Sequence, residues 1–415
     1  MQRVAIIGAG MVGLSTAWFL QEQGAHVTVY DRQHVAPGSS WGNAGWLTPA
    51  LTAPLPEPAV LGYGVRAVLS PSSPVYVPLR PDPRLLRFLT GFARHSTARR
   101  WALGTRAYAP MTRRALDAFE ELVAAGVDSR TRPADPFLAC FHSAEERSAL
   151  VHELEGVRAT GQDVKYTLMT GEEVRAVEPA VSSAVGAAVR IEDQRYLNPP
   201  AFLSALASSV HDRNGDIVEG VGIRDVRAHA DGAALEHERG RTESFDAVVL
   251  ASGAWLGELA RPFGVRRPVQ AGRGYSFSVV SDPLPCGPVY LAGQRVACTP
   301  LHTPNGPRLR VAGMMEFRSP DSALDGRRIK AIVDAARPLL NGVDLDRRED
   351  EWVGSRPVTA DGLPLIGATA SRHVFVAGGH GMWGMVLGPI SGRLLAERIV
   401  TGRQPAELVP FDPLR

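Results

Sequence analysis

Near the start of the 415-residue chain stands Val4-Ala5-Ile6-Ile7-Gly8-Ala9-Gly10-Met11-Val12-Gly13, the stretch that decides the fold. Val4–Ile7 is short, apolar and mostly β-branched, which predicts a strand. A helical pattern follows over Met11–Gln23 and stops at Gly24, a typical residue just past a helix end. Ala25–Tyr30 predicts a second strand. A strand, a helix and a strand with short joints indicate a parallel βαβ unit.

The three glycines of this stretch have the spacing of a dinucleotide-binding turn. Gly8 permits the tight turn, Gly10 lets the backbone approach a pyrophosphate, and Gly13 lets the helix lie close to the strand. Phosphates would then meet the free N–H groups at the helix start. Asp31 closes the second strand and is expected to accept hydrogen bonds from ribose hydroxyls, which disfavours NADP despite the neighbouring Arg32. The alternative is a Gly-rich helix start with a surface aspartate.

Three further segments favour FAD over NAD. Residues 38–46 form a loop of small and hydroxyl-bearing residues, and residues 248–255 predict a strand that runs into a small-residue turn. Residues 378–384 end the last strand and open a helix, whose N-terminus would stabilise the negative charge of a reduced flavin. The expected cofactor contacts are Gly8, Ala9, Gly10, Met11, Val12, Gly13, Asp31, Arg32, Ser39, Ser40, Asn43, Ala44, Gly45, Trp46, Ile223, Ala251, Ser252, Gly253, Trp255, Gly354, Arg356, Gly379, His380, Gly381, Met382, Trp383, Gly384 and Met385.

In this order, these segments resemble the D-amino-acid-oxidase-like FAD-dependent oxidoreductases. Within that family the chain is most similar to the bacterial D-amino acid dehydrogenases, which carry a loop like Ser40-Trp41-Gly42-Asn43-Ala44-Gly45. The stretch 352–367 is similar to the family's substrate-and-flavin motif. The resemblance covers most of the chain and is weakest over residues 60–145. It implies oxidation of a small amino acid with D-selectivity. We expect the FAD to be bound non-covalently, because neither the cysteines nor the histidine of the Gly-rich turn stands where a linkage is expected, and we expect no metal.

Arg356, Tyr275 and His380 are the candidate substrate-binding residues. The guanidinium of Arg356 can hold a carboxylate through two hydrogen bonds, the role that the resemblance gives to the arginine before proline. The alternative is a surface salt bridge. Tyr275 matches a family position near the substrate, or else is a strand tyrosine packed in a sheet. His380 is expected to bond a flavin oxygen or to pack, rather than to transfer protons. Trp46 and Trp383 flank the ring or belong to the core.

We expect no catalytic side chain, since the flavin itself would take the hydride from the α-carbon of a neutral amine. The resulting imine would hydrolyse to a keto acid and ammonia. Oxidation of a secondary amino acid such as sarcosine, proline or hydroxyproline is the first alternative, and a non-catalytic flavin-binding subunit of a complex is the second. An NAD-dependent dehydrogenase is the third. Oxygen and a quinone both remain open as electron acceptors.

Composition and charge limit the partners and the cell compartment that we expect for this protein. The net charge of +2 is spread along the chain, so nucleic acid is not an expected partner. Cys140, Cys286 and Cys298 are too scattered for a disulfide framework or a covalent flavin link, and we expect buried thiols in a cytoplasmic protein. No segment is long and apolar enough to cross a bilayer. If a quinone is the acceptor, Val60–Leu69 or Leu85–Phe92 are candidates for peripheral membrane contact.

The predicted architecture is α/β: a discontinuous Rossmann-type FAD-binding domain over residues 1–60, 145–260 and 345–415, with an inserted mixed-sheet substrate domain (α+β) over residues 61–144 and 261–344. The predicted helices, besides the first, are Arg84–His95, Met111–Ala125, Thr170–Val177, Pro200–Asn214, Ile329–Leu339 and Leu387–Val400. The later predicted strands are Asp216–Val221, Ile223–His229, Ala233–Glu238, Ser244–Ala251, Arg267–Val280, Arg308–Met315 and His373–Ala377.

Overall fold

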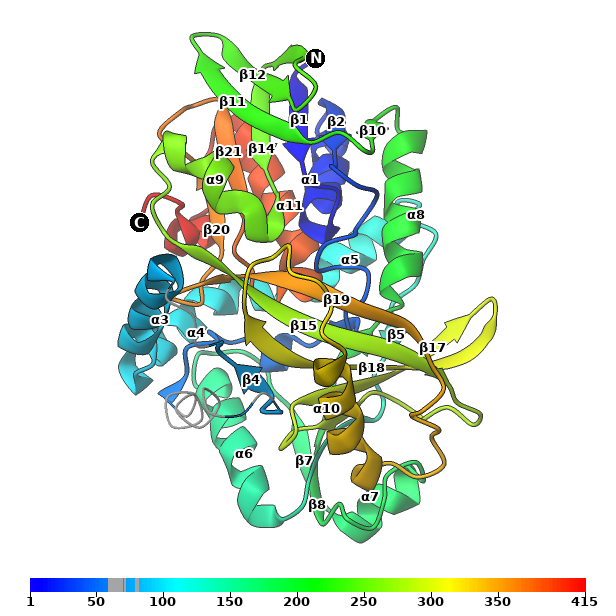
Figure 1. Ribbon diagram of the computed structural model, residues 1–415. Coiled ribbons are helices and arrows are strands. Elements are labelled where there is room, and N and C mark those ends of the chain that lie inside the picture. Colours follow the sequence, from blue (N-terminus) through cyan, green and yellow to red (C-terminus); the bar gives the residue numbers. More distant parts are fainter. Residues whose placement is uncertain (59–69, 71, 79–81) are drawn as a thin grey trace.

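The computed structural model describes residues 1–58, 70, 72–78 and 82–415, and two large sheets organise this part of the chain (Figure 1). The first has the order β10-β2-β1-β14-β21-β20. Its strands are β10 (Asp216–Val218), β2 (His26–Tyr30), β1 (Arg3–Ile7), β14 (Ala247–Leu250), β21 (Val374–Gly378) and β20 (Leu365–Ala368). All neighbours run parallel except β20, which is antiparallel to β21.

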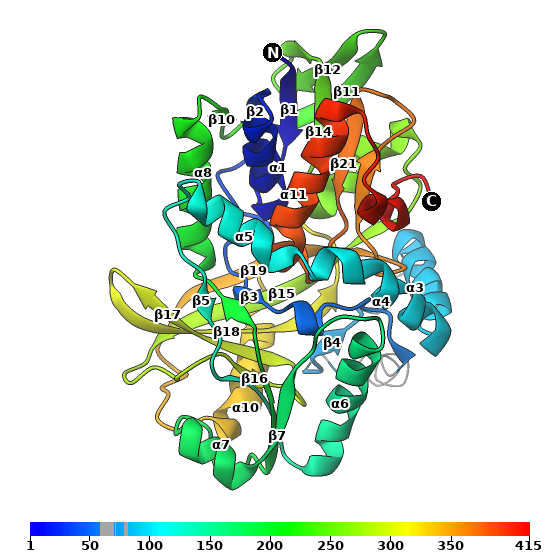
Figure 2. The same ribbon diagram turned by 180° about the vertical axis from the view of Figure 1, so that it is seen from behind.

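Period-two alternation explains how the first sheet is covered on both faces. On one face Val4 and Ile6 pack against α1 (Met11–Glu22), α11 (Gly384–Thr401) and α8 (Pro199–Asp212). Figure 2 shows α1 and α11 side by side on this face. Ala5 and Ile7 face the other way, toward α9 (Leu256–Ala260) and the small sheet of β11 (Ile223–His229), β12 (Gly232–His237) and β13 (Thr242–Phe245).

The predicted βαβ unit is confirmed as β1, α1 and β2. Gly8 has a φ of +116°, which an L side chain rarely adopts. A Cβ on Gly13 would lie 1.9 Å from the carbonyl oxygen of Gly8, so only glycine allows α1 to approach β1 this closely. Asp31 follows β2 directly, at the same edge of the sheet as the glycine turn.

The second sheet has nine strands, eight of them in the order β19-β15-β18-β17-β16-β6-β8-β7, with β4 (Val75–Tyr76) paired to β18. The eight are β19 (Arg348–Thr359), β15 (Val269–Val280), β18 (Gly306–Phe317), β17 (Val296–Thr303), β16 (Val289–Leu291), β6 (Phe137–Phe141), β8 (Ala187–Ile191) and β7 (Tyr166–Thr170). Helix α10 (Gly326–Ala336) packs on one face near β15, and α6 (Ala144–Arg158) packs on β6 and β8. The first sheet and its helices lie above this sheet in Figure 1, and the two parts of the chain meet along β15 and β19.

The remaining described elements lie outside the strands of these sheets. They are β3 (Trp46–Leu47), β9 (Arg195–Tyr196) and β5 (Arg132–Pro133), which form a small sheet, and the helices α3 (Pro83–His95), α4 (Ala98–Thr112), α5 (Ala115–Ala124) and α7 (Gly171–Val177), with 3-10 turns η1 (Pro49–Leu51), η2 (Gly253–Trp255), η3 (Arg261–Phe263), η4 (Arg337–Leu339) and η5 (Ala406–Phe411). The predicted start of α7 is confirmed by a capping box between Thr170 and Glu173.

Two predicted elements are wrong in extent. Met111–Ala125 is not one helix, because α4 ends at Thr112 and α5 begins at Ala115. The preceding helix Ala98–Thr112 was not predicted, since Gly104 and Pro110 interrupt its pattern. Likewise, Ser244–Ala251 is divided between β13 and β14, which belong to different sheets.

The strand pairings also cross the predicted domain boundaries. Strands β7, β8 and β19 were assigned to the FAD-binding part, yet they pair within the second sheet. Conversely, α4 and α5 were assigned to the inserted domain, yet they pack against α11 on the first sheet. The order of elements along the chain could not show this, because short links let consecutive elements belong to different sheets.

Two surface expectations need revision. Cys140 and Cys298 are buried, but Cys286 is exposed in the loop between β15 and β16. In Leu85–Phe92 the side chains of Leu85, Phe88 and Phe92 are buried, in a cluster that includes Phe317, so they form no surface patch. Val60–Leu69 lies outside the described residues. No helix in the described part of the chain is long and apolar enough to cross a membrane.

Candidate cofactor and substrate site

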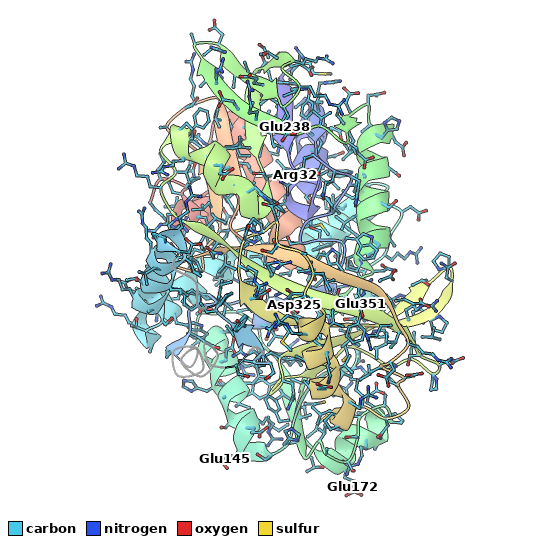
Figure 3. All side chains as sticks on the ribbon, viewed as in Figure 1. Arg32, Glu145, Glu172, Glu238, Asp325 and Glu351 are labelled. Atoms are coloured by element: carbon cyan, nitrogen blue, oxygen red, sulfur yellow. The ribbon has the colours of Figure 1, made fainter. Side chains whose placement is uncertain are left out.

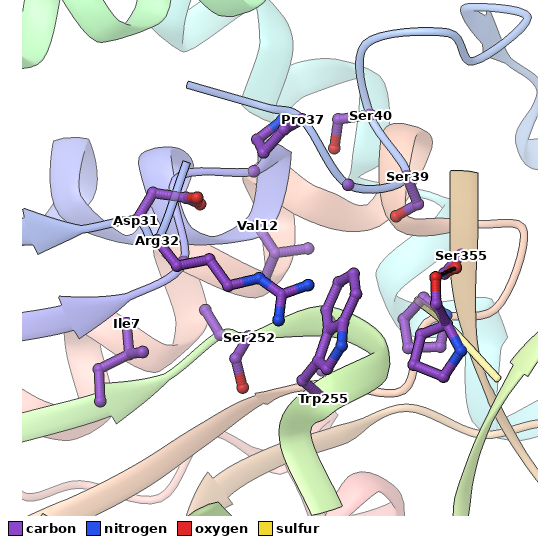
Figure 4. Close-up of a pocket in the computed structure, with 18 of the residues that line it drawn as sticks. Ile7, Val12, Asp31, Arg32, Pro37, Ser39, Ser40, Ser252, Trp255 and Ser355 are labelled. Carbon is purple, nitrogen blue, oxygen red and sulfur yellow. Dashed lines mark hydrogen bonds between the residues drawn. The ribbon is translucent and has the colours of Figure 1, made fainter. Parts of the chain in front are cut away.

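A cavity of about 670 Å³ opens at the carboxyl ends of β1, β2 and β14 (Figure 4). This is the edge of a parallel sheet at which ligands bind in such folds. Residues from β19 and from the loop after β18 form another part of its wall. The predicted contacts that line it are Gly8, Gly10, Met11, Val12, Asp31, Arg32, Ser39, Ser40, Asn43, Ile223, Ala251, Ser252, Gly253, Trp255, Arg356, His380, Gly381, Met382, Gly384 and Met385.

One end of the cavity has the features of a phosphate site. The glycine turn leaves the N-terminus of α1 open to the cavity, and the backbone N–H of Met11 donates to Ser40 Oγ at 3.2 Å. A Cβ on Gly8 would lie 2.4 Å from the carbonyl oxygen of Ala251, so β1 and β14 approach closely here. The hydroxyl of Ser252 is buried and has no hydrogen-bond partner among the residues that the structure describes, so it is available to a ligand.

Asp31 is held by its own neighbourhood. Its Oδ2 accepts from the N–H of Ala9 at 3.0 Å, and its Oδ1 accepts from the N–H of Gln33 at 3.0 Å. These bonds fix the carboxylate at the cavity wall, where its remaining lone pairs can accept from ribose hydroxyls. The residues therefore fit the adenosine diphosphate half of FAD.

The start of α11 forms another part of the cavity wall. His380 is buried, and its Nε2 lies 2.9 Å from Ser391 Oγ, while its Nδ1 has no hydrogen-bond partner in the described part of the chain. Burial lowers the pKa of His380 to about 3, so the ring is neutral. A neutral ring with one free nitrogen can hydrogen-bond a flavin edge and is a poor general base, which fits the role expected from the sequence.

Arg356, on β19, is a cation of the cavity wall. It is half-buried, and its Nη1 donates to the carbonyl oxygen of Met314 at 2.8 Å. Desolvation lowers its pKa to about 10, so it stays protonated at neutral pH. No ion pair joins it to a carboxylate among the described residues. A desolvated cation without a counter-ion is costly, and this is typical of a site that receives an anion.

Glycine on the neighbouring strand makes room for this side chain. Gly274 of β15 lies opposite Gly354 of β19, and a Cβ on Gly274 would lie 2.1 Å from Arg356 Nη2. Any larger residue at position 274 would displace the guanidinium. The predicted motif Arg273-Gly274-Tyr275 therefore supports the site through its glycine.

Tyr275 does not line the cavity. Successive side chains of β15 point to opposite faces, so Tyr275 lies on the face away from Gly274 and packs in the core beneath α10. It is fully buried, and its hydroxyl donates to Glu316 Oε2 at 2.6 Å. The alternative of a strand tyrosine packed in a sheet is the one that the structure shows.

The other expected contacts outside the cavity lining are Ala9, Gly13, Ala44, Gly45, Trp46, Gly354, Gly379 and Trp383. Trp46 packs edge-on against Phe137 and Tyr290, and its indole donates to Thr299 Oγ1. The Trp383 indole donates to the carbonyl oxygen of Ala53. These residues do not face the cavity. A motif includes positions that shape a turn as well as positions that face the ligand.

The cavity also has lining residues that the sequence did not suggest, among them Arg224, Glu238 and Asp321. Glu238 follows β12, and Asp321 lies in the loop between β18 and α10. Neither segment has a motif of its own. Only the folded chain brings them to the glycine turn.

Comparison with known proteins agrees with this geometry. The FAD dependent oxidoreductase (DAO) family matches residues 3–398. A D-amino acid dehydrogenase from Cereibacter sphaeroides is 27% identical over 410 residues, which is 97% of this chain and 92% of that protein. Among solved structures, glycine oxidase from Bacillus cereus has a TM-score of 0.73 at 23% identity and covers 99% of this chain and 98% of its own. Iminodiacetate oxidase from Chelativorans has a TM-score of 0.71 at 19% identity, with 99% of both chains covered.

The family match spans nearly the whole chain, and the cavity is lined by the glycine turn, by an acid at the end of β2 and by the start of α11. This chain belongs to the FAD dependent oxidoreductase (DAO) family and uses FAD as its cofactor.

Proposed function

We propose that this protein oxidises a small amino acid, most readily a D-amino acid, at the carbon that bears nitrogen. The products would be the keto acid and ammonia, after hydrolysis of an imine. The observation that carries the proposal is Arg356, a protonated and half-buried guanidinium in the wall of the cofactor cavity, without a carboxylate partner among the described residues.

Bound FAD supplies a two-electron acceptor for the hydride of the α-carbon. The chain itself has to orient the substrate. Arg356 would bind the α-carboxylate, and the carbonyl of Met314 fixes the guanidinium for that contact. His380 stays neutral beside the site and adds no charge that would compete for the carboxylate. The substrate amine has to be neutral for the lone pair on nitrogen to assist, so the ammonium form has to lose its proton to solvent before the hydride leaves.

Preference for D-amino acids is supported by the D-amino acid dehydrogenase relative, which aligns over nearly the whole chain. The second candidate is a secondary amino acid. Iminodiacetate oxidase and an L-proline dehydrogenase from P. horikoshii are among the proteins of similar fold. Arg356 would anchor the carboxylate in either case, so the candidates differ only in the rest of the pocket.

An anaerobic flavin-reduction screen tests the proposal. Purified holoprotein is mixed with single D- and L-amino acids, glycine, sarcosine and D- and L-proline, and bleaching of the long-wavelength flavin band is followed. Bleaching by D-amino acids is expected, and bleaching by secondary amines alone would replace the first candidate with the second. No bleaching by any of them, in protein that holds flavin, would refute an amino acid substrate. Admitting oxygen or a soluble quinone to the reduced protein then shows which acceptor it uses.

A further inference from the structure

The loop of residues 318–325, between β18 and α10, carries an acid that reaches the opposite wall of the cofactor cavity. Asp321 Oδ1 accepts from Arg32 Nη2 at 3.1 Å, and the Trp255 indole N–H lies 3.0 Å and 3.2 Å from its two carboxylate oxygens. The guanidinium of Arg32 lies 3.9 Å from the centre of the Trp255 ring. Figure 4 shows these two side chains next to each other in the cavity. We call Arg32, Trp255 and Asp321 the clasp.

The clasp joins the two parts of the molecule. Arg32 follows β2 and Trp255 ends the turn after β14, so strands of the first sheet position both residues. Asp321 follows β18, a strand of the second sheet. Arg32 and Asp321 are 289 positions apart in the chain. Figure 3 shows Arg32 in the upper part of the molecule and Asp325, at the far end of the same loop, in the lower part. All three clasp residues line the cavity.

Two side chains of the second sheet hold the backbone of the loop that carries Asp321. Arg273, which is fully buried, donates through Nη2 to the carbonyl oxygens of Ser322 at 2.6 Å and Ala323 at 3.0 Å. Ser355 Oγ donates to the carbonyl oxygen of Pro320 at 3.1 Å. Backbone carbonyls on both sides of Asp321 are therefore fixed, which lowers the entropy cost of placing its carboxylate.

An exposed ion pair by itself is worth little, and the Arg32 and Asp321 side chains are 42% and 62% exposed. The clasp differs because the loop is preset and because the indole contributes both its N–H and its ring. Its place matters as well, since all three clasp residues line the same cavity as the glycine turn and Asp31. We propose that the clasp is a gate for FAD, and that Asp321 is a positioning residue that limits the rate at which the cofactor leaves.

The release rate of FAD from the holoprotein tests this proposal. The holoprotein is diluted into a suspension of charcoal, which traps free FAD, and the loss of bound flavin is followed by absorbance after the charcoal is removed. Asp321→Ala and Asp321→Asn should release FAD roughly three- to tenfold faster than the unchanged protein. Salt should speed release from the unchanged protein and have less effect on Asp321→Ala, because salt screens an exposed pair. A merely structural role for Asp321 would not make the release rate depend on salt in this way.

Asp346→Asn is the matched control. It removes an exposed arginine–aspartate pair of similar kind, Asp346 with Arg337 at 2.8 Å, from a place outside the cavity lining. FAD release from this variant should be unchanged. Trp255→Phe keeps a ring over Arg32 but removes the N–H, and should speed release by a smaller factor. If Asp321→Ala cannot be purified with flavin, Trp255→Phe alone decides the matter. Release at the unchanged rate, with unchanged salt dependence, would overturn the proposal for either variant.

Discussion

Arg356 and Met314 meet through a single hydrogen bond, in which the guanidinium donates to a backbone carbonyl that Met314 presents from a left-handed conformation. The bond is 2.8 Å long, and Met314 has a φ of +67°. Residues other than glycine rarely adopt such a φ, and it costs of order 1 kcal/mol or more. Strain of this kind is typical of places where a backbone group has to point in one direction. Here it fixes the direction of Arg356, which has no carboxylate partner among the described residues.

Replacing Arg356 should separate substrate binding from flavin binding. Arg356→Ala should lower kcat/KM for a carboxylate substrate by roughly 100-fold, because two charge-assisted hydrogen bonds are lost. Arg356→Lys keeps the charge without the fork and should lose roughly tenfold. Stopped-flow flavin reduction gives the rates, and the flavin absorbance of the purified variants gives the cofactor content. Equal kcat/KM in all three proteins would remove Arg356 from the substrate site.

A methyl group at Gly274 should act as an indirect substitution of Arg356. In Gly274→Ala the new Cβ would occupy the place of Arg356 Nη2, so the guanidinium has to move. We expect KM for the substrate to rise roughly tenfold through the loss of aligned charge-assisted bonds, with flavin content unchanged. Gly326→Ala is the control, because nothing lies within 4 Å of the Cβ it would add. The same KM in both variants would contradict the close packing of Gly274 and Arg356.

Carboxylate binding should fail at high pH. The pKa of Arg356 is lowered to about 10 by desolvation, so the guanidinium loses its proton as the pH rises through that value. Propionate has no amine to titrate, so its dissociation constant reports on the anchor alone. We expect this constant, measured from perturbation of the flavin spectrum, to be flat near neutral pH and to rise above about pH 10. Affinity that stays constant through this range would mean that the pKa of Arg356 is not lowered.

His380 should make the fold sensitive to acid. Burial lowers its pKa from 6.5 to about 3, so the unfolded chain binds a proton at a pH where the folded chain does not. Its contribution to stability is therefore complete above pH 6.5 and is lost as the pH falls toward 3. In His380→Gln the Tm should fall less steeply between about pH 6.5 and pH 4. His302→Gln, at an exposed histidine, should keep the slope of the unchanged protein.

Glu153 should act in the opposite direction. Burial and the nearby Glu57 raise its pKa from 4.5 to about 8, against the opposing effect of Arg295. Its contribution to stability is complete below pH 4.5 and is lost as the pH rises through about 8. Glu153→Gln should therefore hold its Tm better than the unchanged protein on going from about pH 5 to pH 9. A parallel Tm profile would show that Glu153 is ionised at neutral pH.

The sequence predicted the parts of this structure that depend on local rules. The glycine turn, α1 and Asp31 lie within one short stretch, and each follows from steric demands that the sequence displays. Arg356 followed from the motif around it. Tyr275 was different, because both faces of β15 are buried and no polar alternation tells which one meets the cavity. Neighbouring positions of a strand face opposite sides, so the assignment of one residue decides whether Gly274 or Tyr275 faces Arg356.

Contacts between distant segments were beyond such rules. Asp321 belongs to no recognisable motif, and its partner Arg32 follows a strand of the other sheet. Helix α4 was missed because its buried face is set by α11 and by Pro54, which packs where Gly104 leaves room, rather than by a clean periodic pattern. The strand pairings cross the predicted domain boundaries for the same reason, since β19 pairs in one sheet and the chain continues through a short turn into β20 of the other.

The strand order of the first sheet has a consequence for synthesis on the ribosome. β1 and β2 emerge first, but β1 pairs on its other side with β14 (Ala247–Leu250), and β14 pairs in turn with β21 (Val374–Gly378). The helix α11 that covers α1 is translated later still, at Gly384–Thr401. The nucleotide site is therefore unfinished until β21 and α11 have been made. Only then can a complete site capture flavin, so loading with FAD follows the synthesis of α11.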